Sequence, residues 1–220
     1  MPNLGTISNV LKNEEAPETF IHIGWGKVYE PHDISHMREN LFAGKNMIDT
    51  MYERGVKRII HIGSSSEYGD RVGLLQEKNF VPQGKVNNYV NAKISLAKYG
   101  LERAKKLDRI FIHIRLFYTY GAGQQHNSLI NQMFSNAIEG SFMHLSPCLQ
   151  FRDYIFVEDA AVGINKLVKH NKSGIVNLGS GKVVQLKQFV RIFWNELGQD
   201  EMLLKFGSHE QPMTEQKQPQ

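Results

Sequence analysis

Two residues of the sequence, Tyr89 and Lys93, have the types and spacing of an acid/base pair. Residues four apart on a helix share one face, so the phenol and the ammonium group can reach the same point. A nearby cation favours the phenolate and is expected to lower the tyrosine pKa, which would let the hydroxyl exchange protons with a sugar or an alcohol. The alternative interpretation is a surface tyrosine and a surface lysine that do no chemistry.

Hydroxyl groups follow an apolar run upstream of this pair. Residues 58–63 have the length and composition of a strand, and residues 63–69 read Gly-Ser-Ser-Ser-Glu-Tyr-Gly. We therefore expect the serine hydroxyls at the carboxyl end of that strand, where parallel sheets collect their ligands. A serine-rich turn without a function is the alternative.

The apolar periodicity predicts the elements that position these residues. Strand-length apolar runs alternate with segments of helical period, and this order predicts an α/β fold with a doubly wound parallel sheet. The expected strands are Phe20–Ile23, Arg58–Gly63, Ile110–Arg115 and a short one near Ile175–Leu178, and the expected helices are 38–54, 88–106, 128–139, 158–170 and 185–196.

The composition narrows the class of protein. With 41% hydrophobic and 22% charged residues, the 220-residue chain has the proportions of a soluble globular protein. The net charge of +4 comes without a long basic run, so no nucleic-acid partner is expected. Cys148 is the only cysteine, which excludes an intrachain disulfide and a cysteine-based zinc site, and it is interpreted as a small apolar filler. No signal pattern opens the chain and no apolar stretch approaches ~18 residues, so a cytoplasmic protein without a membrane partner is predicted.

Two further segments complete an ordered set of motifs. Residues 115–124 read Arg-Leu-Phe-Tyr-Thr-Tyr-Gly-Ala-Gly-Gln, and residues 152–161 read Arg-Asp-Tyr-Ile-Phe-Val-Glu-Asp-Ala-Ala. In this order, the four segments resemble the extended short-chain dehydrogenase/reductase family, in particular its nucleotide-sugar epimerases, dehydratases and ketoreductases. The resemblance covers about 20–197. It implies a Rossmann-like fold, NAD or NADP as cofactor with NAD favoured, a nucleotide-diphosphate sugar as substrate, and hydride transfer at a sugar carbon.

The resemblance implies catalytic roles for residues already singled out. Tyr89 resembles the catalytic tyrosine of the family, and Lys93 resembles the lysine that holds the nicotinamide ribose and lowers the tyrosine pKa. Ser65 resembles the hydroxyl that completes the triad. Because the serine segment is one residue shorter than the common family form, Ser64 and Ser66 remain candidates for that hydroxyl.

The family's dehydratases carry an acid beside the serine or threonine. Glu67 lies near that place but out of register, so the resemblance leaves a dehydratase role unassigned.

The resemblance also implies a set of cofactor contacts. Residues 23–27 resemble the segment after the fourth Rossmann strand, Asn40 resembles an asparagine near the nicotinamide half, and residues 116–117 take the place of a Pro-Phe pair. Turn glycines, a surface lysine and an ordinary polar helix residue are the alternative interpretations. The residues expected to contact the cofactor are Ile23, Gly24, Lys27, Asn40, Tyr89, Lys93, Leu116 and Phe117.

Two residues are implied as substrate contacts. Arg152 matches an arginine that reaches the substrate diphosphate, a role that suits a planar, permanently charged group. Tyr118 stands where the family commonly has an asparagine that binds the sugar nucleotide. The alternative for Arg152 is a structural pair with Asp153 or Asp159, which are interpreted as caps of the helix that begins near Glu158.

One family element is not present in the sequence. The family opens with a strand, a Gly-x-x-Gly-x-x-Gly turn and a helix that binds the dinucleotide pyrophosphate, whereas the only glycine before Gly24 is Gly5. The resemblance therefore implies a chain that lacks the first strands and the last elements. The open sheet edge would then be covered by residues 1–19 or by another chain, so a homodimer is left open.

These observations predict four segments and two functions. The segments are an N-terminal segment (1–19), a partial NAD-binding domain (20–125), a small substrate-binding part (126–206) and a polar, disordered tail (207–220). The favoured function is that of an NAD(P)-dependent nucleotide-sugar enzyme. The alternative is a non-catalytic remnant that serves as a binding or assembly module.

Overall fold

The computed structural model describes residues 15–71 and 73–210. Most of the predicted N-terminal segment, and the predicted tail after residue 210, lie outside the described residues. The chain forms two compact units that are discontinuous in sequence. Of the described residues, the first unit contains 15–71, 75–116 and 162–178, and the second contains 73–74, 117–161 and 179–210.

The first unit is built on a four-stranded parallel sheet. Its strands follow the order β1-β2-β3-β7, and all three pairings are parallel. The bounds are β1 (Thr19–His22), β2 (Arg58–Ile62), β3 (Ile110–Leu116) and β7 (Gly174–Leu178). Every residue of β2 is buried, as expected for a central strand with both faces covered. The predicted parallel α/β sheet is therefore confirmed.

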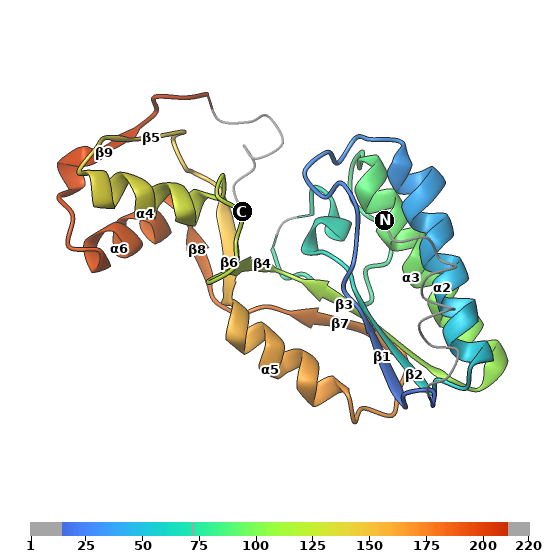
Figure 1. Ribbon diagram of the computed structural model, residues 1–220. Coiled ribbons are helices and arrows are strands. Elements are labelled where there is room, and N and C mark those ends of the chain that lie inside the picture. The colour runs from blue at the N-terminus through green and yellow to red at the C-terminus, as the bar shows by residue number, and fades with distance from the viewer. Residues whose placement is uncertain (1–14, 72, 211–220) are drawn as a thin grey trace. The chain divides into compact units, whose positions relative to one another are not determined.

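Helices cover both faces of this sheet. A π-helical turn (His36–Asn40) leads into α2 (Leu41–Glu53), which lies beside α3 (Asn88–Leu107) on one face, and α5 (Val157–Leu167) lies on the other (Figure 1). The α3 helix begins at Asn87, whose side chain accepts the Val90 N–H as an N-cap.

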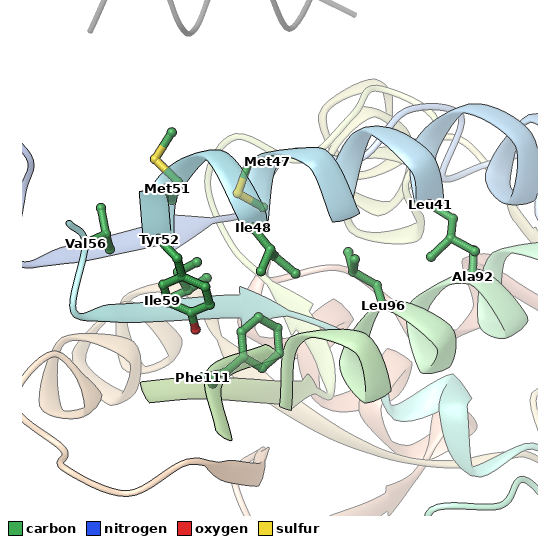
Figure 2. Packing of buried hydrophobic residues seen from close by; sticks show 11 residues of the cluster. Leu41, Met47, Ile48, Met51, Tyr52, Val56, Ile59, Ala92, Leu96 and Phe111 are labelled. Atoms are coloured by element: carbon green, nitrogen blue, oxygen red, sulfur yellow. The ribbon is translucent and has the colours of Figure 1, made fainter. Parts of the chain in front are cut away.

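The core of the first unit lies between the sheet and the helix pair. Figure 2 shows Ile48 of α2 and Leu96 of α3 pointing toward one another above the strand residues Ile59 and Phe111. A side chain at Gly100 of α3 would collide with the Phe111 ring, so a glycine is required where helix and strand approach. On the opposite face the buried isoleucines of β2 and β3 pack against α5 and β7.

The second unit combines short strands with two amphipathic helices. Its elements are β4 (Tyr118–Tyr120), α4 (Leu129–Glu139), β5 (Met143–Leu145), β6 (Phe151–Phe156), β8 (Val183–Gln185), α6 (Leu186–Glu196), a 3-10 turn (Glu201–Leu203) and β9 (Leu204–Phe206). Strand β6 pairs with β4 in parallel and with β8 in antiparallel orientation, and β5 pairs with β9. Met133, Cys148 and Trp194 are among the residues of its core, which confirms Cys148 as a buried filler.

The structure corrects the role expected for Asp153. Its carboxylate accepts the Ser180 N–H and hydroxyl, each at 2.7 Å, and the Gly181 N–H at 2.9 Å. Three donors of one turn converge on this carboxylate, so Asp153 fastens the turn to β6 rather than capping a helix. Asp159 does lie in the first turn of α5, where its negative charge is favourable.

Among residues 15–71 and 73–210, no helix has the length and apolar character needed to cross a bilayer.

Candidate functional site

A serine hydroxyl meets the Tyr89 side chain at the carboxyl end of β2. Ser64 follows the strand and caps a 3-10 turn (Ser65–Tyr68), and its hydroxyl oxygen accepts the Ser66 N–H at 3.1 Å. Tyr89 lies at the start of α3, where its own N–H donates to the Pro31 carbonyl at 2.9 Å. The Ser64 side chain is near enough to the Tyr89 hydroxyl to act on it as a hydrogen-bonding partner, which works to lower the tyrosine pKa. Of the three candidate serines, Ser64 is therefore the one whose hydroxyl the fold brings to the tyrosine.

The electrostatics of Tyr89 differ from the expectation. Burial raises the pKa of the Tyr89 hydroxyl, the hydrogen bond with Ser64 opposes this, and the negative charge of Glu67 raises the pKa further. The net direction is upward, so the predicted lowering by Lys93 is wrong for this structure. The reason is the partial burial of the Tyr89 ring, which packs edge-on against Trp25 and His36.

Lys93 lies one helical turn after Tyr89 and is buried, with 3% of its surface exposed. Its ammonium donates to the Ile62 carbonyl at 2.7 Å and lies 4.0 Å from the centre of the Trp25 ring. The same ammonium is 5.8 Å from the centre of the Tyr89 ring. Burial lowers the pKa of Lys93 to about 7, although the charge of Glu67 opposes this shift.

Trp25 covers Lys93 from the loop after β1, and a buried network holds this loop. The Trp25 indole N–H and the Asn40 amide both lie 3.1 Å from His36 Nδ1, and Asn40 also donates to the Gly26 carbonyl at 2.9 Å. His36 Nε2 lies 3.0 Å from the Glu30 carbonyl, which can only accept. His36 therefore donates through Nε2 and accepts through Nδ1. Asn40, expected at the cofactor, is committed to this network.

The other residues expected at the cofactor are more open. Ile23 is 65% exposed, and an added Cβ at Gly24 would meet nothing within 4 Å. Lys27 is exposed and pairs with Asp33 at 2.6 Å. Leu116 is the last residue of β3 and belongs to the first unit, whereas Phe117 belongs to the second unit.

Three histidines form a row across the sheet that the sequence analysis did not single out. His22, His61 and His113 are register partners on β1, β2 and β3. The Nδ1 atoms of His22 and His61 are 3.1 Å apart, and the ring centres of His61 and His113 are 5.2 Å apart. Burial, with the charge of Lys93, lowers the pKa of His22 to about 4 and that of His61 well below its usual range. The sequence feature that could have identified this row is the tripeptide Ile-His-Ile, which occurs at 21–23, 60–62 and 112–114, in or at the end of β1, β2 and β3.

A buried carboxylate, Glu67, lies at the end of this row. It accepts from His113 Nε2 at 2.9 Å and from Arg115 Nε at 3.1 Å, and all three side chains are fully buried. Burial acts to raise the Glu67 pKa, but the charge and hydrogen bond of His113 outweigh it, together with the Ser64 N–H and Arg115, so the pKa is lowered. Glu67 therefore carries a negative charge that faces into the protein.

The second unit has a pocket of about 270 Å³ with aromatic walls. Tyr154 stacks on Phe189 with ring centres 4.1 Å apart, and the Arg152 guanidinium lies 4.8 Å from the centre of the Tyr118 ring. Arg152 also donates to the carbonyl of residue 151 at 2.8 Å. The lining residues are Tyr118, Thr119, Tyr120, Gln124, Leu129, Ile130, Gln150, Arg152, Tyr154, Leu186 and Phe189.

The first unit therefore offers proton-transfer groups, and the second offers a surface for a flat, anionic ligand. Within the described residues, no group of three or more His, Cys, Asp or Glu side chains is placed to hold a metal ion.

Comparisons with known proteins agree with the fold. The model of the family described as "NAD dependent epimerase/dehydratase family" matches residues 3–179. A dTDP-6-deoxy-L-talose 4-dehydrogenase (NAD(+)) from Aggregatibacter actinomycetemcomitans is 25% identical over 178 residues, which are 80% of this chain and 65% of that protein.

Solved structures show the same architecture. A UDP-N-acetylglucosamine 4-epimerase from Bacillus cereus is 21% identical with a TM-score of 0.81, and the match covers 93% of this chain and 69% of that one. A dTDP-glucose 4,6-dehydratase from Bacillus anthracis in complex with NAD is 20% identical with a TM-score of 0.80, covering 93% and 64%. The chain thus spans less than two thirds of the length of the curated relatives that it matches.

Proposed function

Because the chain belongs to the NAD-dependent epimerase/dehydratase family, we propose that it catalyses hydride transfer at a sugar carbon of a nucleotide sugar, with Tyr89 as the proton-transfer group. The observation that carries this proposal is the placement of three side chains at the carboxyl end of β2: Ser64 in the turn after the strand, Tyr89 in the first turn of α3, and Lys93 one helical turn later, bonded to the Ile62 carbonyl. These are the group types that exchange a proton with a substrate hydroxyl.

The cofactor that we propose is NAD, with NADP as the alternative. When bound, it would accept a hydride from the sugar carbon or return one. Solved relatives of this fold contain NAD, and two features of this chain fit such a ligand. The Ile23–Gly24 backbone is open, and the Lys93 ammonium uses one of its three donors on the Ile62 carbonyl. Lys93 would hold a ribose hydroxyl, which requires the Trp25 indole to move, because it covers the ammonium.

Tyr89 would remove the proton of the sugar hydroxyl while the hydride leaves the same carbon, and would return the proton in the reverse direction. Ser64 would hydrogen-bond the reacting oxygen and favour the phenolate form of Tyr89. A Lys93 ammonium near the tyrosine would favour the phenolate as well. In the ligand-free chain this last effect is not realised, because burial keeps the Tyr89 pKa raised.

The substrate class that we propose is a nucleotide-diphosphate sugar. The stacked rings of Tyr154 and Phe189 provide a surface for a nucleotide base, and the Arg152 guanidinium suits phosphate oxygens. Relatives of the chain include a dTDP-6-deoxy-L-talose 4-dehydrogenase and a UDP-glucose 4-epimerase. Tyr118 stands at the position where the family commonly has an asparagine that binds the sugar nucleotide. In this chain the Tyr118 ring lies under the Arg152 guanidinium and would orient it.

Among the reactions of this family, the position of Glu67 favours epimerisation or ketone reduction over dehydration. A dehydratase needs an acid that faces the substrate beside the serine hydroxyl. The Glu67 carboxylate is fully buried and engaged by His113, Arg115 and the Ser64 N–H. It is therefore not available for that role.

The alternative function is a binding or assembly module without turnover. It is favoured by the lack of a Gly-x-x-Gly-x-x-Gly turn in the 220 residues and by the covered Lys93 ammonium. A homodimer and a cytoplasmic location stay predictions from the sequence.

The test is turnover of UDP- and dTDP-hexoses with NAD, followed by NMR of the sugar protons and by NADH absorbance. We expect a new hexose configuration or a keto sugar, and a roughly 10²–10⁴-fold lower kcat for Tyr89→Phe with substrate binding intact. Equal turnover in both chains would contradict the role of Tyr89. Nucleotide-sugar binding without turnover in either chain would support the binding module, and no binding at all would overturn both functions.

A further inference from the structure

Glu67 lies directly behind the residue that contacts Tyr89. Its Oε1 atom accepts the Ser64 N–H at 2.9 Å, in the same turn in which the Ser64 hydroxyl accepts the Ser66 N–H. Ser64 is therefore bonded through both its backbone and its side chain, and these bonds determine where its hydroxyl points.

The carboxylate is itself fixed by two side chains of strand β3. His113 Nε2 lies 2.9 Å from both carboxylate oxygens, and Arg115 Nε lies 3.1 Å from Oε2. The Arg115 guanidinium stacks 4.3 Å from the centre of the Tyr68 ring and donates to the Asn79 carbonyl. A buried charge is tolerated only with such partners, and here they leave the carboxylate a single orientation.

The backbone next to this cluster is packed without spare room. A Cβ at Gly63 would collide with the Glu67 carboxylate and the His113 ring. A glycine is thus needed between the end of β2 and Ser64 so that the carboxylate can reach under the turn. Gly63, Ser64 and Glu67 therefore form a single structural unit, in which each residue depends on the other two.

We propose that Glu67 is a positioning residue, which holds the Ser64 backbone through its carboxylate so that the Ser64 hydroxyl hydrogen-bonds Tyr89. His113 and Arg115 act through Glu67 by fixing the carboxylate. This inference rests on the proposed function in so far as Ser64 and Tyr89 are its reacting groups, but the geometry that it describes exists without cofactor or substrate.

The test is a double-mutant cycle read out on Tyr89 itself. Chains labelled with 3-fluorotyrosine give a fluorine NMR resonance for position 89, assigned by its loss in Tyr89→Phe, and the fluorine lowers the phenol pKa so that the titration stays at moderate pH. The effect of Ser64→Ala on this pKa is measured in the native chain and in Glu67→Gln. Glutamine keeps the shape of the side chain, and the cycle cancels the direct effect of the Glu67 charge.

We expect Ser64→Ala to raise the Tyr89 pKa by about 0.5 to 1 in the native chain, the value of one hydrogen bond. In Glu67→Gln the same substitution is expected to change the pKa by less than about a third of that. An equal rise in both backgrounds would overturn the proposal. As a matched control, Asp49→Asn removes another carboxylate bonded to an arginine, on α2, and should leave the Ser64→Ala effect unchanged.

A second pair of variants decides the proposal if Glu67→Gln does not fold. His113→Gln keeps a donor toward the carboxylate, whereas His113→Leu has none. We expect the Ser64→Ala effect to persist in His113→Gln and to shrink in His113→Leu, and equal effects in the two would refute the proposal. These titrations need no ligand, so they test the role of Glu67 whether or not the chain is active. A chain without turnover would contradict only the proposed function. In an active chain, Glu67→Gln should lower kcat and leave KM unchanged.

Discussion

At the scale of single residues, the pKa values of the site depend more on the burial of the side chains than on their spacing along the helix. Tyr89 and Lys93 have the spacing of an acid/base pair, yet both lie against the sheet, so burial raises the pKa of the phenol and lowers that of the ammonium. Ser64, and not Ser65, meets the tyrosine, because Ser64 caps the turn after β2 while Ser65 already belongs to that turn.

Ser64→Ala and Ser65→Ala should separate the two serines. Ser64→Ala removes the hydroxyl that hydrogen-bonds Tyr89, and we expect kcat to fall by roughly 10- to 100-fold, as for the loss of one hydrogen bond in the transition state. Ser65→Ala should remain within about twofold of the native chain. The measurement is steady-state turnover at saturating substrate. The reverse order of the two effects would show that the turn changes its register when ligands bind.

Lys93→Met should stabilise the chain at acidic pH. The folded-state pKa of Lys93, about 7, lies below its ordinary value of 10.5, so the unfolded chain binds an extra proton between these values and stability rises with pH there. Below about pH 7 the chain must bury the charge. We expect urea unfolding at pH 6 to show Lys93→Met more stable by up to roughly 5 kcal/mol, with the gap closing toward pH 10. A gap that does not change with pH would contradict the buried-cation interpretation.

At the scale of elements, the histidine row is a consequence of parallel register. Each of the three neighbouring strands carries its histidine at the same level, so the rings lie side by side on the face covered by α2 and α3. Burial on that face disfavours the charged form of His22 and His61. The row therefore makes the sheet sensitive to acid, apart from any effect on the reacting groups.

His61→Leu should reduce this acid sensitivity. A histidine that stays neutral in the folded chain and has its ordinary pKa of 6.5 when unfolded costs about 2 kcal/mol at pH 5, and nearly nothing at pH 8. Stability is thus lost as the pH falls below about 6.5. We expect the difference in unfolding free energy between pH 8 and pH 5 to be smaller in His61→Leu than in the native chain. The matched control is His144→Leu on β5, an exposed histidine of the second unit, which should leave that difference as it is.

At the scale of the whole molecule, the two units carry different parts of the proposed chemistry. The first unit contains the proton-transfer groups, and the second contains the aromatic pocket with Arg152. Neither the 220-residue sequence nor the described residues contain the glycine-rich turn and following helix that bind a dinucleotide pyrophosphate in this family. Without this turn and helix in the 220 residues, the property expected to be weakened most directly is the affinity for the cofactor.

We expect the 220-residue chain to bind NAD weakly, with a Kd of roughly 0.1 mM or higher. At 1 mM NAD, such a Kd would raise the free energy of unfolding by at most about 1.4 kcal/mol. Calorimetric titration and thermal unfolding with and without NAD measure this directly. Stoichiometric binding at micromolar NAD would show that another part of the chain, or a second copy, supplies the pyrophosphate contacts.

The sequence by itself determined the parallel sheet with its four strands, the five long helices, the family, and the shared helix face of Tyr89 and Lys93. These follow from local periodicity and from motifs read along the chain. The structure changed the ends of these elements and added the short strands β4, β5, β6, β8 and β9, which the periodicity did not predict. Only the tertiary structure decided which serine meets Tyr89, that Asn40 is committed to His36, that Glu67 faces inward, and that the Tyr89 pKa is raised. The physical reason is that burial and strand register depend on residues far apart in sequence: the Ile-His-Ile tripeptides and Glu67 gain their meaning only when β1, β2 and β3 lie side by side.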